Sequence, residues 1–156
     1  MSKTINVVFV CLGNICRSPM AEAVFQHIVD ERGLSDQFHI ESAGTAHWHI
    51  GERPHIGTQQ ILKKYRVPLR ASKTGQQVQS DIFERFDYVV AMDSSNQSDL
   101  KQYGNAILLL EDVPGIDILD VPDPYFDNNF DKVYHLVLAG CNHLLDRICK
   151  EKDMAC

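Results

Sequence analysis

The sequence predicts an α/β fold, in which one mainly parallel, four-stranded sheet is covered by helices on both faces. Short β-branched or apolar runs alternate with segments of helical periodicity, and the runs carry few polar residues. Strands buried on both faces have this composition, and parallel neighbours need long, usually helical crossovers. The length of 156 residues favours one domain, spanning residues 1–156 as a three-layer sandwich.

The first half of the chain begins with a predicted strand over residues 5–10, which leads into a loop that contains glycine. Apolar positions recur at helical spacing after Ser18, so we expect a helix with Ser18 as N-cap and Pro19 as first residue. Gly33 is placed to end this helix. The next strand, an irregular loop and a second helix are predicted at residues 38–42, 44–53 and 54–65.

The second half supplies the remaining strands and the closing helix. Apolar runs at residues 88–91 and 106–110 suit strands that are buried on both faces. Residues 111–129 hold three prolines and six acidic residues, which predicts a long surface loop. A helical stripe then resumes at Phe130 and should close the domain. In such sheets the ligand binds beyond the carboxyl ends of the strands.

Composition and charge exclude several classes of protein. With 44% apolar and 23% charged residues, the chain is typical of a soluble globular protein. Its net charge of -6 has the wrong sign for holding a nucleic-acid backbone, so no nucleic-acid partner is expected. The apolar run near the N-terminus is too short for a signal peptide or a spanning helix. We therefore expect a cytoplasmic protein without membrane association.

The five cysteines are an odd number with no CxxC pair, so a disulfide framework is not expected and all five are predicted to be thiols. The spacing of Cys141, His143 and Cys149 fits no common zinc site. We expect neither a metal nor a cofactor.

The loop after the first strand combines three features that favour an anion. Its backbone N–H groups can form a nest, and the following helix adds the positive end of its dipole. Arg17 can grip two oxygens of a tetrahedral oxyanion, and the same field favours a thiolate at Cys11. Neither a Walker A loop nor the dinucleotide fingerprint fits the spacing. The predicted phosphate-binding loop consists of Cys11, Leu12, Gly13, Asn14, Ile15, Cys16, Arg17 and Ser18.

With Val10-Cys11-x5-Arg17-Ser18-Pro19, the sequence resembles the low-molecular-weight protein tyrosine phosphatase family. Further blocks in family order lie at residues 20–23, 41–45, 86–96 and 123–125. The resemblance implies hydrolysis of phosphotyrosine in proteins, and of small aryl phosphates, through a cysteinyl-phosphate intermediate. Phosphotyrosine-containing proteins are the expected partners, with inorganic phosphate as product or inhibitor, and the chain is expected to be a monomer or weak dimer.

The resemblance also implies roles for individual residues. Cys11 is the nucleophile, Arg17 the phosphate clamp, and Asp123 the general acid that later acts as base. A carboxylic acid above the pocket suits that role, because phenolate leaves poorly unless it is protonated. Asp112, Asp117 and Asp120 are nearby competitors for it. Asn14, Ser18 and Ser42 would support the loop, while Trp48 and Tyr125 would line the substrate pocket.

Cys16 matches a cysteine found in many relatives. A second thiol in the same loop could capture an oxidised Cys11 as a disulfide, or it could simply pack beneath the loop. Lys73 and Gln76 depart from the family pattern, in which many members have His and Arg before a Gln. We therefore expect different polar contacts in that region.

Three other functions are weighed against phosphotyrosine hydrolysis. An arsenate reductase of this fold needs further cysteines in the middle of the chain, and none occurs between Cys16 and Cys141. Arginine phosphatases tend to have Thr where this loop has Ile15, so Ile15 favours phosphotyrosine. A non-catalytic, phosphate-binding redox sensor would not need Cys11, Arg17 and Asp123 together.

Overall fold

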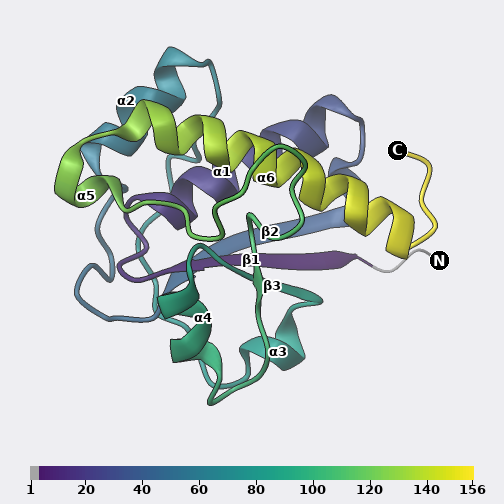
Figure 1. Cartoon of the computed structure of the whole chain (residues 1–156), viewed down its shortest axis with the longest axis horizontal. Coiled ribbons are helices and arrows are strands. Elements are labelled where there is room, and N and C mark those ends of the chain that lie inside the picture. Colours follow the sequence, from purple (N-terminus) through teal and green to yellow (C-terminus); the bar gives the residue numbers. More distant parts are fainter. Residues whose placement is uncertain (1–3) are drawn as a thin grey trace.

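The computed structural model describes residues 4–156, and its centre is a sheet of four parallel strands in the order β2-β1-β3-β4 (Figure 1). This confirms the predicted α/β class and the parallel sheet. The strands lie close to the predicted positions, at β1 (Ile5–Cys11), β2 (Phe38–Gly44), β3 (Tyr88–Ala91) and β4 (Ile107–Leu108).

Helices cover both faces of the sheet, as predicted. One face carries α1 (Arg17–Glu31), α2 (Ile56–Lys64) and α6 (Phe130–Glu151), and the other carries the shorter α3 (Ile82–Arg85) and α4 (Ser94–Leu100) (Figure 1). The remaining elements are a 3-10 turn, η1 (Ser35–Gln37), and the short helix α5 (Pro124–Asp127). No helix within residues 4–156 combines the length and the apolar character needed to cross a membrane.

Strand β1 shows why its sequence is apolar throughout. Val7 and Phe9 are buried in the larger core beneath α1 and α6, whereas Val8 and Val10 are buried in the smaller core beneath α3 and α4. Successive side chains of a strand point to opposite faces, so both faces of β1 need apolar residues. The strand is thereby fixed at the centre of the molecule.

The start of α1 differs from the prediction. The helix begins at Arg17 with Cys16 in the N-cap position and no side-chain cap, so Ser18 is not the N-cap. The Ser18 hydroxyl is instead hydrogen-bonded to the Cys11 sulfur, at 3.0 Å, in the loop before the helix. The helix end agrees with the prediction, because Gly33 follows it with a φ of 70°.

Two other elements are shorter than predicted. Helix α2 begins at Ile56 because His55 caps it, with Nδ1 of His55 accepting from the Gly57 N–H at 2.9 Å. Strand β4 contains only Ile107 and Leu108. Both differences concern boundaries and leave the order of elements unchanged.

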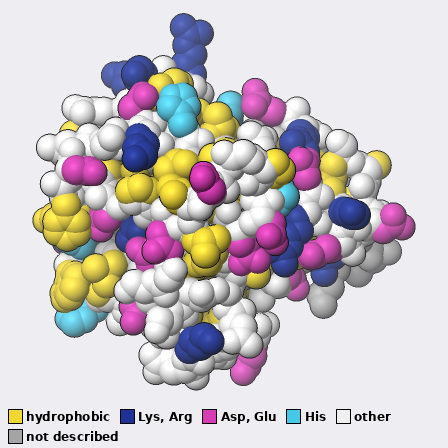
Figure 2. Space-filling model, in the orientation of Figure 1, with side chains coloured by type: hydrophobic (Ala, Val, Ile, Leu, Met, Phe, Trp, Pro, Cys, Tyr) yellow, Lys and Arg dark blue, Asp and Glu magenta, His cyan; other side chains and the backbone are white. Residues whose placement is uncertain are grey.

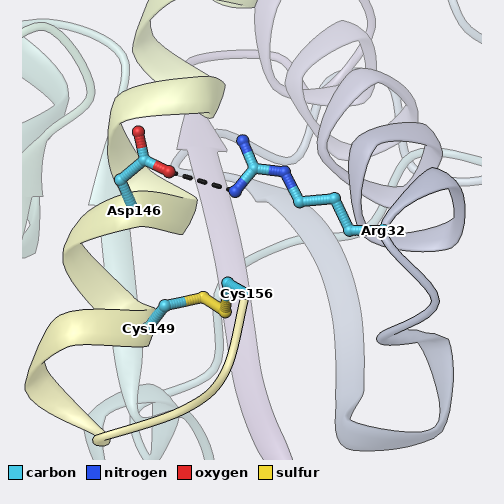
Figure 3. The surroundings of a disulfide bond; sticks show 4 residues. All are labelled: Arg32, Asp146, Cys149 and Cys156. Carbon is cyan, nitrogen blue, oxygen red and sulfur yellow. Dashed lines mark hydrogen bonds and ion pairs between the residues drawn. A yellow bond between two sulfur atoms is a disulfide. The ribbon is translucent and has the colours of Figure 1, made fainter.

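The C-terminal segment corrects the prediction for two cysteines. Cys149 on α6 and Cys156 form a disulfide, so they are not free thiols (Figure 3). The chain turns back after α6, where the Met154 N–H donates to the Cys149 carbonyl at 2.8 Å, and this reversal brings Cys156 to the helix. Beside the disulfide, Arg32 pairs with Asp146 at 3.0 Å and ties the end of α1 to α6 (Figure 3).

Candidate active site

The candidate site lies at the carboxyl end of β1. The chain passes from β1 to β2 on one side and later to β3 on the other, so the strand order reverses at β1 and opens a crevice there. Cys11 ends the strand, and Arg17 begins α1. A cavity of about 230 Å³ occupies this position, and its lining residues are Cys11, Leu12, Gly13, Ile15, Cys16, Arg17, Trp48, His49, Asp123, Tyr125 and Phe126.

The Cys11 sulfur is buried and lies among hydrogen-bond donors. The Asn14 backbone N–H donates to it at 3.3 Å, and the Ser18 hydroxyl oxygen is 3.0 Å away. Asn14 has a φ of 57°, in the left-handed region where Asn is enriched among residues other than glycine. This conformation turns the Asn14 N–H back toward the sulfur.

The side chain of Asn14 connects the loop to its support. Its amide nitrogen donates to the Ser18 hydroxyl at 2.8 Å and to the Ser42 hydroxyl at 3.0 Å. Because the Ser18 oxygen already accepts from Asn14, its own proton is free to point at Cys11. The structure therefore brings the three predicted support residues together, in an arrangement that favours a thiolate.

Arg17 is buried, and two acceptors hold one of its terminal nitrogens. Its Nη1 donates to the Asp93 carboxylate at 2.6 Å and to the Val121 carbonyl at 2.9 Å, while Nη2 lies 3.7 Å from Asp123. Burial opposes the charge of Arg17, but Cys11 and Asp93 outweigh it and raise the pKa of the guanidinium. Sequence reasoning missed Asp93. Its place just after β3, the neighbour of β1, was the available signal.

Asp123 is the one carboxylate among the residues that line the cavity. It caps α5, where its carboxylate accepts from the Tyr125 N–H at 3.0 Å. The competitors Asp112 and Asp117 do not line the cavity, and Asp120 instead accepts from the backbone and hydroxyl of Ser94. The geometry thus favours Asp123 for an acid that faces a bound phosphate ester.

Exposed aromatic side chains surround the mouth of the cavity. Trp48 and Tyr125, the two predicted pocket residues, are 62% and 53% exposed, and Phe126 is 82% exposed. Yellow side chains gather on the surface in the region of α5 (Figure 2). Sequence reasoning did not assign Phe126 to the pocket, although its place beside Tyr125 was a signal.

Cys16 lies in the same loop but in a different environment from Cys11. It is 5% exposed, and burial, together with the charges of Cys11 and Asp123, raises the pKa of its thiol to about 12. Cys16 is therefore a neutral thiol at physiological pH. Its role as a redox partner stays a prediction.

Comparison with known proteins adds independent information. Residues 6–154 match the family model described as low molecular weight phosphotyrosine protein phosphatase. The chain is 45% identical over 158 residues to "Low molecular weight protein-tyrosine-phosphatase PtpA" of Staphylococcus epidermidis, with 96% of this chain and 97% of that protein covered.

Two solved structures extend the comparison. The crystal structure of YfkJ from Bacillus subtilis superposes with a TM-score of 0.93 at 42% identity, covering 97% of this chain and 98% of that one. The crystal structure of DARP, a Drosophila arginine phosphatase, superposes with a TM-score of 0.82 at 32% identity, covering 91% and 96%.

Proposed function

Because the chain belongs to the low molecular weight phosphotyrosine protein phosphatase family, we propose that it hydrolyses phosphotyrosine in proteins, and small aryl phosphates, through a cysteinyl-phosphate intermediate. The observation that carries the proposal is the Cys11 sulfur, which lies in a cavity whose polar wall is formed by Arg17 and Asp123. The sulfur accepts a hydrogen bond from the backbone of the same loop.

In the first step, the Cys11 thiolate attacks phosphorus and the bond to the tyrosyl oxygen breaks. Asp93 and Val121 accept from Nη1 of Arg17, so the remaining N–H donors of the guanidinium are available for the equatorial oxygens of the phosphoryl group. Nη2 of Arg17 lies 3.7 Å from the Asp123 carboxyl group, so a phosphate ester held by Arg17 is within reach of Asp123. Asp123 then gives its proton to the departing phenolate oxygen.

In the second step, water attacks the phosphorus of the intermediate. Asp123, now a carboxylate, accepts a proton from that water, and the Cys11 thiolate leaves. The Ser18 hydroxyl and the Asn14 N–H, at 3.0 and 3.3 Å from the sulfur, stabilise the leaving thiolate. Inorganic phosphate is the product and, because it fits the same nest, an expected inhibitor.

Ile15 and the aromatic residues bear on the choice between phosphotyrosine and phosphoarginine. The Ile15 side chain lines the cavity and is 7% exposed, so it offers an apolar wall to the substrate. Trp48 and Tyr125 add aromatic surfaces that suit a phenyl ring. These contacts favour phosphotyrosine over the guanidinium group of phosphoarginine, and turnover of the two amino acids compared directly will test the preference.

The proposed mechanism is tested with Cys11→Ser, and Cys141→Ser, at a buried free cysteine outside the cavity lining, is the matched control. Cys11→Ser should lose turnover of p-nitrophenyl phosphate while still binding inorganic phosphate, measured by calorimetry. Cys141→Ser should keep turnover, and rapid mixing of the wild type should give a burst of nitrophenol equal to the enzyme concentration. Turnover by Cys11→Ser would rule out the covalent mechanism.

We also propose that Cys16 protects Cys11 from irreversible oxidation. Peroxide converts an accessible thiolate to a sulfenic acid, and the Cys16 sulfur then displaces hydroxide to form a disulfide, with water as the by-product. Oxidation removes the charge of Cys11, which is one of the causes that raise the pKa of Cys16. After peroxide and then reductant, wild type should recover more activity than Cys16→Ser. Equal recovery, without a Cys11–Cys16 disulfide in mass spectrometry, would contradict the proposal.

A nucleophilic thiolate persists in reducing surroundings, so we propose that the enzyme works in the cytoplasm, where we expect the Cys149–Cys156 disulfide to be reduced. We further propose that it is a monomer or weak dimer. Cell fractionation and sedimentation velocity at micromolar concentration will check both statements. Recovery in an oxidising compartment, or a stable higher oligomer, would contradict them.

A further inference from the structure

Lys73 is a buried cation beneath the phosphate-binding loop. It is 3% exposed, whereas lysine is rarely fully buried unless it is paired. Its ammonium donates to the Asn14 side-chain oxygen at 3.0 Å and to the Ser42 carbonyl at 3.1 Å, and it lies 3.5 Å from the Glu22 carboxylate. The three donors of the ammonium thus have three oxygen partners.

Glu22 compensates the buried charge but does not explain its position. Burial lowers the pKa of the Lys73 ammonium, and Glu22 opposes that shift. Glu22 also accepts from the Ser42 hydroxyl at 2.6 Å and from Arg70 at 2.6 Å. The carboxylate therefore already has one cation without Lys73, and a buried ion pair is weak evidence for a stabilising role.

The contact with Asn14 leads directly to the nucleophile. The Asn14 side-chain oxygen accepts from Lys73 and, at 3.0 Å, from the Gln76 backbone N–H. Both lone pairs of that oxygen are used, so the amide can present its nitrogen only toward Ser18 and Ser42. The Asn14 backbone, held in the left-handed region, donates its own N–H to Cys11.

We propose that Lys73 is a positioning residue for the reaction: its ammonium holds the Asn14 amide, so that the Asn14 N–H and the Ser18 hydroxyl stay directed at the Cys11 sulfur. Lys73 does not line the cavity and touches no reacting atom. The effect on turnover rests on the proposed function, whereas the effect on the Cys11 sulfur does not.

Arg70 provides a matched control. Like Lys73 it is a cation paired with Glu22, but its guanidinium is bonded to that carboxylate and not to Asn14. Arg70→Met controls for the loss of a cation beside Glu22 at a side chain that is 57% exposed, whereas that of Lys73 is 3% exposed. The double variant Glu22→Gln, Lys73→Met controls for the buried charge, because a change at Cys11 that persists in it comes from the lost contact with Asn14. If Lys73 positions Asn14, Lys73→Met should change the properties of Cys11 and Arg70→Met should not.

The test is the rate of Cys11 alkylation by iodoacetamide from pH 4 to pH 9, followed by mass spectrometry of the Cys11 peptide. In Lys73→Met the midpoint of this pH profile should move upward by about one pH unit, which corresponds to about a tenfold change in the thiolate equilibrium. In Arg70→Met it should stay within about a third of that shift. Equal shifts in the two variants, or no shift in a folded Lys73→Met protein, would overturn the proposal.

Turnover of p-nitrophenyl phosphate gives a second readout. Lys73→Met should lose about tenfold or more in kcat, as expected for weakening a hydrogen bond to a charged group. Circular dichroism will check folding. If Lys73→Met does not fold, the double variant Glu22→Gln, Lys73→Met removes both charges and should still show the alkylation shift.

If neither Lys73→Met nor the double variant Glu22→Gln, Lys73→Met folds, Lys73 has a structural role and the proposal is overturned. The proposed function can fail independently. Wild-type protein without phosphatase activity, but with the expected alkylation shift, would reject the function and keep the positioning role.

Discussion

The floor and the rim of the cavity are built in opposite ways. We define the floor as the lining residues Cys11 and Arg17 together with Asn14, Ser18 and Ser42, which support the loop without lining the cavity; each is no more than 3% exposed. We define the rim as Trp48, Tyr125 and Phe126, each more than half exposed. Hydrogen bonds fix every floor residue, whereas the rim residues Tyr125 and Phe126 meet edge to face with ring centres 5.5 Å apart. The floor is a closed polar network, and the rim is an open apolar surface.

This difference separates the two tasks of the enzyme. Removing a floor side chain leaves a buried polar partner unsatisfied, so its cost reaches the geometry of the reacting sulfur. Removing a rim side chain leaves no buried polar group without a partner, because the rim side chains already face water. We therefore expect floor substitutions to act on kcat and rim substitutions to act on substrate binding.

Among the substitutions that keep the Cys11 nucleophile, Arg17→Lys has the largest expected effect. Arg17 holds Asp93 with one nitrogen, and its proposed role needs the rest of its planar fork for the phosphate; the point charge of lysine cannot do both. We expect kcat for p-nitrophenyl phosphate to fall by about 10³-fold or more. Arg32→Lys, on the distant pair with Asp146, is the control and should be silent. A near-normal kcat in Arg17→Lys would remove Arg17 from the floor.

Asp123→Asn should follow, with an effect that depends on the leaving group. Phenyl phosphate needs a proton from Asp123 and should lose about 10²-fold or more in kcat, whereas p-nitrophenyl phosphate should lose much less. The neighbouring Asp120→Asn is the matched control, because Asp120 binds Ser94 and does not line the cavity. Equal losses across a series of leaving groups would reassign the role of Asp123.

The contrast between floor and rim also explains what the sequence could predict. Cys11, Arg17 and Ser18 lie within eight residues, so their common loop is visible as a local pattern. Family resemblance added Ser42 and Asp123. Asp93 was missed, and Lys73 was expected only to change the polar contacts of its region, without a partner being named. The two residues contact Arg17 and Asn14 from 76 and 59 residues away, and only the packing of the strands and loops brings them there.

Two of the differences between prediction and structure have physical causes that lie in tertiary contacts. Ser18 has the composition of an N-cap, but its hydroxyl is used by Cys11, and a local rule does not register that tertiary contact. Cys149 and Cys156 are seven residues apart, and their pairing depends on the reversal of the chain after α6. The order of the four strands and of the helices α1, α2 and α6 was predictable because it depends on apolar periodicity, whereas α3, α4, α5 and η1 were not predicted as separate elements.

Substitution of a rim residue should have a smaller effect on the enzyme than Arg17→Lys or Asp123→Asn. Phe126→Ala should raise the Kd of a phosphotyrosine peptide for the Cys11→Ser protein a few-fold, because single interface contacts rarely contribute more. Its kcat on p-nitrophenyl phosphate should not change. Leu119→Ala, also exposed but outside the cavity lining, is the control. A large loss of kcat in Phe126→Ala would contradict the division between floor and rim.

The smallest expected effect on activity is at Cys16, which shares the burial of the floor without its charge and acts on stability instead. Burial, with the charges of Cys11 and Asp123, raises the pKa of this thiol to about 12 from an ordinary 9.0. The unfolded chain therefore loses this proton first as the pH rises. The contribution of Cys16 to stability is complete below pH 9 and is lost between pH 9 and about 12.

Urea unfolding of wild type and Cys16→Ala at several pH values between 8 and 11 measures this contribution. Lysine and tyrosine side chains titrate in both proteins, so the difference in the free energy of unfolding isolates Cys16. That difference should be constant below pH 9 and should then fall by up to about 1.4 kcal/mol per pH unit. If it stays constant to pH 11, Cys16 titrates alike in the folded and unfolded chains. The loop would then be open to water at this residue, and Cys16 would belong with the rim rather than the floor.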